Sequence, residues 1–167
     1  MTLHELNLLP KQQLRDELMK CCGSQAWVEK MLPFFPADDM VELLEDAEEQ
    51  WFKCSEKDWK EAFAQHPKIG DIESLEEKFA STATWAAGEQ GAIKTASSET
   101  LQQLKEANQQ YEEKFGYIFI VCAAGKSANE MLGMLQTRLQ NSPEVEIEIA
   151  ADEQNKITKL RIEKILE

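Results

Sequence analysis

Histidine is scarce in this sequence, and its scarcity limits the chemistry that the chain can perform. Only two histidines occur among the 167 residues, at His4 and His66. No C-x-x-C pair occurs among the four cysteines, which are Cys21, Cys22, Cys54 and Cys122. Zinc and iron sites need clusters of His, Cys and carboxylate ligands. We therefore expect no bound metal, and we expect four reduced, partly buried thiols.

Basic side chains are also few. The chain has 18 Lys and Arg against 31 Asp and Glu, which gives a formal net charge of −13. Binding to a nucleic-acid backbone or to an anionic membrane surface requires clustered Lys and Arg. The composition therefore excludes nucleic acid and membrane as expected partners. An anionic substrate would need local donors that act against the overall negative field.

Long apolar runs are missing too. No stretch approaches the roughly 18 apolar residues that a membrane-spanning helix needs. The first residues, MTLHELNLLPKQQ, carry acidic and polar side chains too early for a signal peptide. The last three, Ile165-Leu166-Glu167, differ from a peroxisomal Ser-Lys-Leu address. We therefore expect a cytoplasmic protein.

Helical periodicity is what the sequence has instead, together with 43% hydrophobic residues, which is enough for a core. The expected N-caps of its helices are Ser24, Asp38 or Asp39, Ser55, Ser97 or Ser98, Ser127 and Ser142. Gly23 and Gly116 are expected to end helices. Because no repeat or Gly/Ser linker divides the chain, we predict one all-α domain over residues 1–167, a bundle of about seven to nine helices.

Two segments depart from plain helical periodicity. Residues 117–122 (YIFIVC) are the one continuous apolar, β-prone run, and we expect a short, buried, extended segment there. Val145, Ile147 and Ile149 alternate as in a strand. No second strand of similar strength is available to pair with them, so we predict a helix after Ser142.

His66 is the first candidate for chemistry. Pro67 disfavours helical backbone at His66, so this histidine should lie where a helix ends and a loop begins. The ordinary pKa of a histidine suits proton transfer near neutral pH, and loops fixed by proline and glycine, as at Gly70, often position catalytic groups. The alternative is a structural histidine whose ring caps a helix carbonyl.

Glu89 is the second candidate. It lies in Trp85-Ala86-Ala87-Gly88-Glu89-Gln90-Gly91-Ala92, where small neighbours allow a ligand or a backbone to approach closely. A glutamate in such a setting could be partly buried, with a shifted pKa. Gln90 could bind an amide or urea group through both its donor and its acceptor. The alternative is an ordinary exposed glutamate of a helix.

The segment that follows the apolar run suggests two further sites. Gly125-Lys126-Ser127 mimics the end of a phosphate loop, but Ile120 stands where that motif requires glycine. Cys122 fits a buried thiol better than a nucleophile. What remains is a backbone that could hydrogen-bond a small planar ligand. Arg161 is, by default, a surface charge of a helix.

Taken together, four segments resemble the 2-oxo-4-hydroxy-4-carboxy-5-ureidoimidazoline (OHCU) decarboxylase family of urate breakdown. The segments are AQHPKIGD at 64–71, WAAGEQGA at 85–92, NQQYEEKFGYIFIVCAAGKS at 108–127 and ITKLRIEK at 157–164. Their order and spacing are those of the family, and the similarity runs through nearly the whole chain.

The resemblance implies an all-helical homodimer that decarboxylates a small ureidoimidazoline to (S)-allantoin without a cofactor. On the matching positions, His66 would be the principal catalytic acid/base and Glu89 its carboxylate partner. The substrate would be lined by Pro67, Ala86, Gln90, Phe119, Ile120, Val121, Cys122, Ala123 and Arg161. One residue departs from the family, since Ala86 stands where the family usually has serine.

Two other interpretations stay open. The chain could be a non-catalytic, acidic helical module that binds a protein partner, which would explain the charged helix faces. It could also be another lyase or hydrolase that uses His66 and Glu89 on a different ureido compound. Within the decarboxylase interpretation, the sequence leaves open which of the two residues delivers the proton that sets the stereochemistry.

Overall fold

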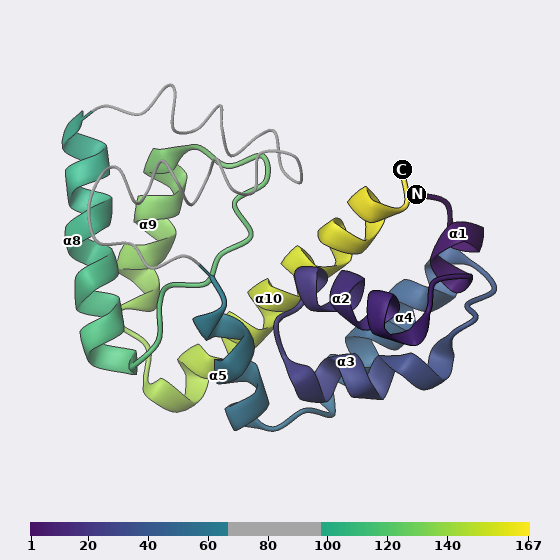
Figure 1. Ribbon diagram of the computed structural model, residues 1–167. Helices are drawn as coiled ribbons and strands as arrows, with labels where there is room; N and C mark the ends of the chain where they lie inside the picture. The colour runs from purple at the N-terminus through teal and green to yellow at the C-terminus, as the bar shows by residue number, and fades with distance from the viewer. Residues whose placement is uncertain (67–97) are drawn as a thin grey trace. The chain divides into compact units, whose positions relative to one another are not determined.

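The structure of the chain, a computed structural model, describes residues 1–66 and 98–167 (Figure 1). Within these two ranges the regular structure is helical throughout, with eight α-helices and one 3-10 helix and no strand. The predicted all-α class is therefore confirmed. The chain forms two compact units, one from residues 1–65 with 154–167 and one from residues 66–153.

The first unit is a cluster of short helices around tryptophan side chains. Its elements are α1 (Leu3–Asn7), α2 (Lys11–Cys21), α3 (Gln25–Met31), η1 (Leu32–Phe34), α4 (Met40–Phe52), α5 (Glu56–Ala64) and the last part of α10 (Pro143–Ile165). Helix α3 packs against α2, α4 and α5. Trp27, Trp51 and Phe63 are at most 1% exposed and form the centre of this core. The two chain ends lie side by side (Figure 1).

Three helices of the first unit, α3, α4 and α5, begin at predicted caps. The Ser24 hydroxyl accepts from the Trp27 N–H, and the Asp39 carboxylate accepts from the Glu42 N–H. Ser55 opens α5 with a reciprocal capping box, since the Asp58 carboxylate also accepts from the Ser55 N–H. Each cap satisfies a backbone donor that a helix start leaves without an intrahelical partner.

Gly23 directly follows the C-cap of α2, where the helix was predicted to end, and it also has a second role. Helix α2 ends at Cys21, and the backbone of Gly23 is not left-handed. A Cβ atom at Gly23 would lie 2.3 Å from Gln65 Cγ and 2.7 Å from Gln65 Cβ. Glycine is required here because the link between α2 and α3 passes so close to the end of α5.

The second unit contains α8 (Ser98–Phe115), α9 (Ala128–Arg138) and the first part of α10. Helices α8 and α9 lie side by side (Figure 1). Gly116 ends α8 as predicted, with a φ of 83° that a residue with a side chain rarely adopts. The predicted buried segment follows without regular secondary structure, and Ser127 then caps α9 by accepting from the Glu130 N–H.

The alternating pattern of Val145, Ile147 and Ile149 lies in helix α10, as predicted. The segment is helical from Pro143 onwards, and the Ser142 hydroxyl accepts from the Val145 N–H at 3.4 Å. Val145 is 50% exposed whereas Ile147 is 5% exposed. Its first part belongs to the second unit and its last part to the first. None of the helices in the described ranges is long and apolar enough to cross a membrane.

Candidate active site

Helix α5 places His66 at the predicted junction. The helix ends at Ala64, and the Gln65 N–H donates to the carbonyl oxygen of Ala62 in its last turn. His66 follows directly and is half-buried. Gln65, the residue before it, lies close to Gly23 of the first unit. The histidine therefore follows a helix whose last turn packs through the buried Ala62 and Phe63.

Pro67, Ala86, Glu89 and Gln90 all lie outside the described residues. Their roles stay predictions. Of the predicted site residues, the structure describes His66 and residues 119–123 in the second unit and Arg161 in the first.

Residues 119–123 form a continuous buried stretch between α8 and α9. Exposure ranges from 1% at Ile120 to 8% at Val121. Several backbone groups of the stretch have protein partners. Arg138 Nη1 donates to the Ile120 carbonyl oxygen at 2.6 Å, and Lys126 Nζ donates to the Cys122 carbonyl oxygen at 2.8 Å. The Cys122 N–H donates to Glu153 Oε1 at 3.4 Å.

A buried ionic cluster, which the sequence did not reveal, contacts this stretch through Arg138. Arg138 Nε and Nη2 both donate to Glu146 Oε2, at 2.9 and 2.6 Å, and the Tyr111 hydroxyl donates to the same oxygen at 2.5 Å. Burial and the bond to Glu146 raise the pKa of Tyr111 far above its usual value, so the phenol stays protonated. One signal was available, since Arg138 continues the apolar stripe of Met131 and Leu135.

The residues that mimic a phosphate loop are occupied in other ways. Lys126 binds the Cys122 carbonyl oxygen, and its own N–H donates to the Ala123 carbonyl oxygen. Ser127 serves as the cap of α9. Gly125, with a φ of 73°, lies in the turn between Ala123 and Lys126. The geometry is that of a helix-capping turn, which agrees with the incomplete motif.

Arg161 lies on the part of α10 that belongs to the first unit. Its side chain is half-buried, and Nη1 donates to the carbonyl oxygen of Lys20 at 3.4 Å. Nearby, burial raises the pKa of the Cys21 and Cys22 thiols to about 12. The positive charge of Arg161 lowers these pKa values, but by less than burial raises them. All four cysteines are buried, free thiols.

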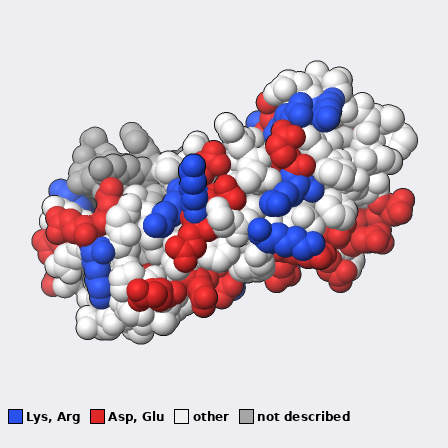
Figure 2. Space-filling model, turned by 90° about the horizontal axis from the view of Figure 1, so that it is seen from below, with Lys and Arg blue, Asp and Glu red and all other residues white. Residues whose placement is uncertain are grey.

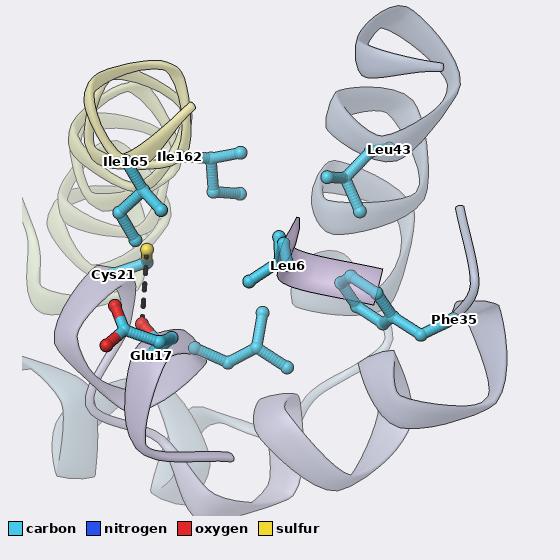
Figure 3. A pocket seen from close by; sticks show the side chains of 8 residues that line it. Leu6, Glu17, Cys21, Phe35, Leu43, Ile162 and Ile165 are labelled. Carbon is cyan, nitrogen blue, oxygen red and sulfur yellow. Dashed lines mark hydrogen bonds between the residues drawn. The ribbon is translucent and has the colours of Figure 1, made fainter. Parts of the chain in front are cut away.

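Two pockets of the first unit are unsuited to the substrate. The first is apolar and has a volume of only about 10 Å³, room for one water. Figure 3 shows its lining side chains from α1, α2, α4 and α10, with the Cys21 thiol donating to the Glu17 carbonyl oxygen. The second, of about 120 Å³, is lined by three carboxylates, Asp38, Glu42 and Asp46, which repel an anion.

The surface charges agree with the charge balance of the sequence. Figure 2 shows one face of the molecule, on which Lys and Arg side chains lie among Asp and Glu side chains. Pairs such as Arg15 with Glu29 and Lys53 with Glu49 neutralise part of this charge locally. Among the residues that the structure describes, no group of three or more His, Cys, Asp or Glu could hold a metal ion.

Comparison with known sequences gives a consistent result. The family model described as OHCU decarboxylase matches residues 7–163. The chain is 41% identical over 153 residues to the uric acid degradation bifunctional protein TTL of Arabidopsis thaliana, and the match covers 90% of this chain and 46% of that protein. It thus spans less than half of this longer relative. It is 25% identical to the 2-oxo-4-hydroxy-4-carboxy-5-ureidoimidazoline decarboxylase of Haloferax volcanii, over 97% of this chain and 94% of that one.

Solved structures agree with the sequences. A crystal structure of OHCU decarboxylase in the presence of (S)-allantoin superposes with a TM-score of 0.74 at 40% identity, covering 90% of this chain and 97% of that one. A crystal structure of (S)-allantoin synthase superposes with a TM-score of 0.71 at 17% identity, over 97% of this chain and 53% of that one. The second likeness shows a shared fold.

Proposed function

The chain belongs to the OHCU decarboxylase family, and on that premise we propose that it decarboxylates 2-oxo-4-hydroxy-4-carboxy-5-ureidoimidazoline to (S)-allantoin in urate breakdown. The observation that carries the proposal is the match of the family model to residues 7–163. The position of His66 supports the proposal. A group that transfers protons must be held within reach of the substrate, and His66 directly follows the packed end of α5.

The substrate can supply its own electron sink. Its carboxylate is attached to a carbon that also carries a hydroxyl and is bonded to the carbon of a ring C=N. When the bond to the carboxylate breaks and CO2 leaves, the electron pair forms a C=C bond and the imine nitrogen takes up a proton. The hydroxyl then loses its proton as a carbonyl forms, and the former imine carbon receives a proton. The protein has to orient the substrate and to deliver that last proton to one face.

We assign the residues on this scheme as follows. His66 transfers protons, and Glu89 accepts a hydrogen bond from the substrate or from His66. The buried stretch 119–123 offers backbone groups to the planar ring and ureido group. Arg161 carries a positive charge suited to a carboxylate. Pro67, Ala86 and Gln90 complete the lining, and no step requires a cofactor.

We also propose that the protein acts as a homodimer in the cytoplasm. The resemblance to the family supports the dimer. Four cysteines without a disulfide support a reducing compartment. Sedimentation velocity at micromolar concentration tests the dimer, because a species of 19.1 kDa would contradict it.

The experiment that tests the activity uses the substrate as it forms. The unstable intermediate is generated in situ by urate oxidation, and its disappearance is followed with and without the purified chain. We expect the chain to accelerate the loss of the intermediate in proportion to protein concentration. Binding without acceleration would favour the non-catalytic module, and hydrolysis without release of CO2 would favour a different ureido enzyme.

A further inference from the structure

Three charged side chains of the described residues are almost completely buried, and all three belong to the second unit. They are Arg138, Glu146 and Glu153, with exposures of 5%, 0% and 4%. Burial of a charge is costly unless partners satisfy it. A buried ion pair is seldom more stabilising than apolar residues of the same volume. Stability alone therefore does not account for this cluster.

The contacts of Arg138 divide into two sets. Nε and Nη2 donate to Glu146, which neutralises the charge. Nη1 donates to the carbonyl oxygen of Ile120 at 2.6 Å, and the guanidinium carbon lies 4.4 Å from the centre of the Phe119 ring. One rigid, planar group thus holds two consecutive residues of the buried stretch, one by its backbone and one by its ring.

Glu146 is fixed in turn from two other places. The Tyr111 hydroxyl on α8 donates to Oε2, and Asn141 Nδ2 donates to Oε1 at 3.1 Å. The carboxylate therefore cannot rotate without breaking several bonds, and the guanidinium bound to it is restricted to one orientation.

The far side of the stretch is held as well. The Cys122 N–H donates to Glu153 and the Cys122 carbonyl oxygen accepts from Lys126. Val121 lies between Ile120 and Cys122, and no hydrogen bond within the described ranges engages its N–H or carbonyl group. The clamp on both neighbours fixes the direction in which these two groups of Val121 point.

We propose that Arg138 and Glu146 are positioning residues, which hold the 119–123 backbone so that Val121 presents its N–H and carbonyl group to the substrate. The inference rests on the proposed function, because that function makes residues 119–123 part of the substrate lining. Displacement of a binding group by about 1 Å costs up to roughly 100-fold in rate or binding. The pair acts through the backbone and touches no reacting atom.

The test replaces both charges together, as Arg138→Met with Glu146→Gln. Methionine retains much of the volume, and the glutamine carbonyl oxygen still accepts from the Tyr111 hydroxyl. No buried charge is left alone, so we expect the double variant to fold. We expect its KM and its Kd for (S)-allantoin to rise at least fivefold. KM does not depend on the folded fraction, so a role in stability alone would leave it unchanged.

The matched control is Arg15→Met with Glu29→Gln, the same substitutions in an exposed pair of the first unit with a bidentate contact of 2.7 and 3.3 Å. We expect its KM to equal that of the wild type. A KM and an allantoin Kd within twofold of wild type in the folded Arg138/Glu146 variant would overturn the proposal. If that variant does not fold, the same KM and Kd measurements on Arg138→Lys test the proposal with the same criterion. Lysine keeps the charge beside Glu146 but lacks the planar fork of arginine.

Hydrogen exchange separates this proposal from the proposed function. Amides of residues 119–123 should exchange at least tenfold faster in the Arg138/Glu146 variant, whether or not the chain decarboxylates anything. Unchanged exchange would overturn the clamp. If the clamp is seen but the wild type neither consumes the intermediate nor binds (S)-allantoin, the proposed function fails instead.

Discussion

The two units of this chain differ in where their paired charged side chains lie, at the surface in the first and in the interior in the second. In the first unit the core is built from Trp27, Trp51 and Phe63, and ion pairs such as Arg15 with Glu29 lie at the surface. In the second unit an arginine and two glutamates are buried behind the backbone of residues 119–123. An apolar core with ion pairs at the surface is the more stabilising arrangement. Burial of the three charges costs desolvation free energy, and we expect such a cost where a backbone must be held in one position for binding.

The largest expected effect is the loss of activity in His66→Ala. A proton-transfer group contributes roughly 10²- to 10⁴-fold in rate, whereas a half-buried residue after the end of α5 contributes little to the core. We expect kcat to fall by that factor and the far-UV circular dichroism and unfolding transition to stay as in the wild type. Near-full turnover would refute the assignment, and unfolding would revive the structural role of this histidine.

Glu89→Gln should come next, because it keeps the shape and removes the charge of the proposed carboxylate partner. We expect kcat to fall by about 10² or more. The control is Glu49→Gln on α4, whose side chain is 60% exposed and paired with Lys53 at the surface. That variant should match the wild type. A change in Glu89→Gln confined to KM would show that Glu89 binds the substrate without transferring a proton.

Gly23→Ala sharpens the comparison from the side of the first unit. The new Cβ would lie 2.7 Å from Gln65 Cβ, which is attached to the backbone and cannot move away cheaply. Overpacking of this kind costs about 1–3 kcal/mol of unfolding free energy, measured by urea denaturation. Gly133→Ala on α9 is the matched control, because nothing lies within 4 Å of its Cβ and we expect a gain of about 0.5–1 kcal/mol. Equal effects of the two substitutions would contradict the close contact.

Alkaline pH should weaken the first unit through its thiols. Burial raises the pKa of Cys21 and Cys22 from 9.0 to about 12 in the folded chain. Their stabilising contribution is therefore fully present below pH 9 and is lost as the pH rises towards 12, since the unfolded thiols ionise first. Between pH 9 and 10 each thiol removes up to about 1.4 kcal/mol. Urea denaturation at both pH values checks this, and Cys21→Ala should reduce the loss. A loss unchanged by that substitution would contradict the assignment to Cys21.

Ala86→Ser should have the smallest effect. The family usually has serine at this position, and a neutral hydrogen bond to the substrate would tighten binding by about 0.5–1.5 kcal/mol, or two- to tenfold. We expect no change, because a water or Gln90 can supply the missing contact. Titration with (S)-allantoin decides. A two- to tenfold gain would show that the hydroxyl contacts the ligand, and a loss beyond tenfold would show that position 86 is packed tightly.

Local features of the sequence predicted much of this structure. The caps at Ser24, Asp39 and Ser55 follow from side-chain chemistry within four residues, and the structure confirms them. Pro67 correctly predicted that the helix ends before His66, because its effect reaches only the preceding residue. Gly116 ends α8 for an equally local reason.

Features that depend on tertiary contacts were not predicted. Helix α1 was missed for a different reason, because it is only five residues long and too short for periodicity to reveal, although its Thr2 capping box is local. Gly23 meets Gln65 across 42 positions of sequence. The pairing of Arg138 with Glu146, and of both with the 119–123 backbone, depends on how α8, α9 and α10 pack together. A charged residue within an apolar stripe was the one local sign of that cluster.

The handedness of the product tests the central claim most directly, because only an oriented substrate is protonated on one face. The intermediate is generated in situ, consumed completely in the presence of the chain, and the circular dichroism of the allantoin is recorded. The account predicts the signal of pure (S)-allantoin with the wild type and no signal from the spontaneous reaction. Racemic allantoin formed at an accelerated rate, or (S)-allantoin formed no faster than without protein, would contradict it.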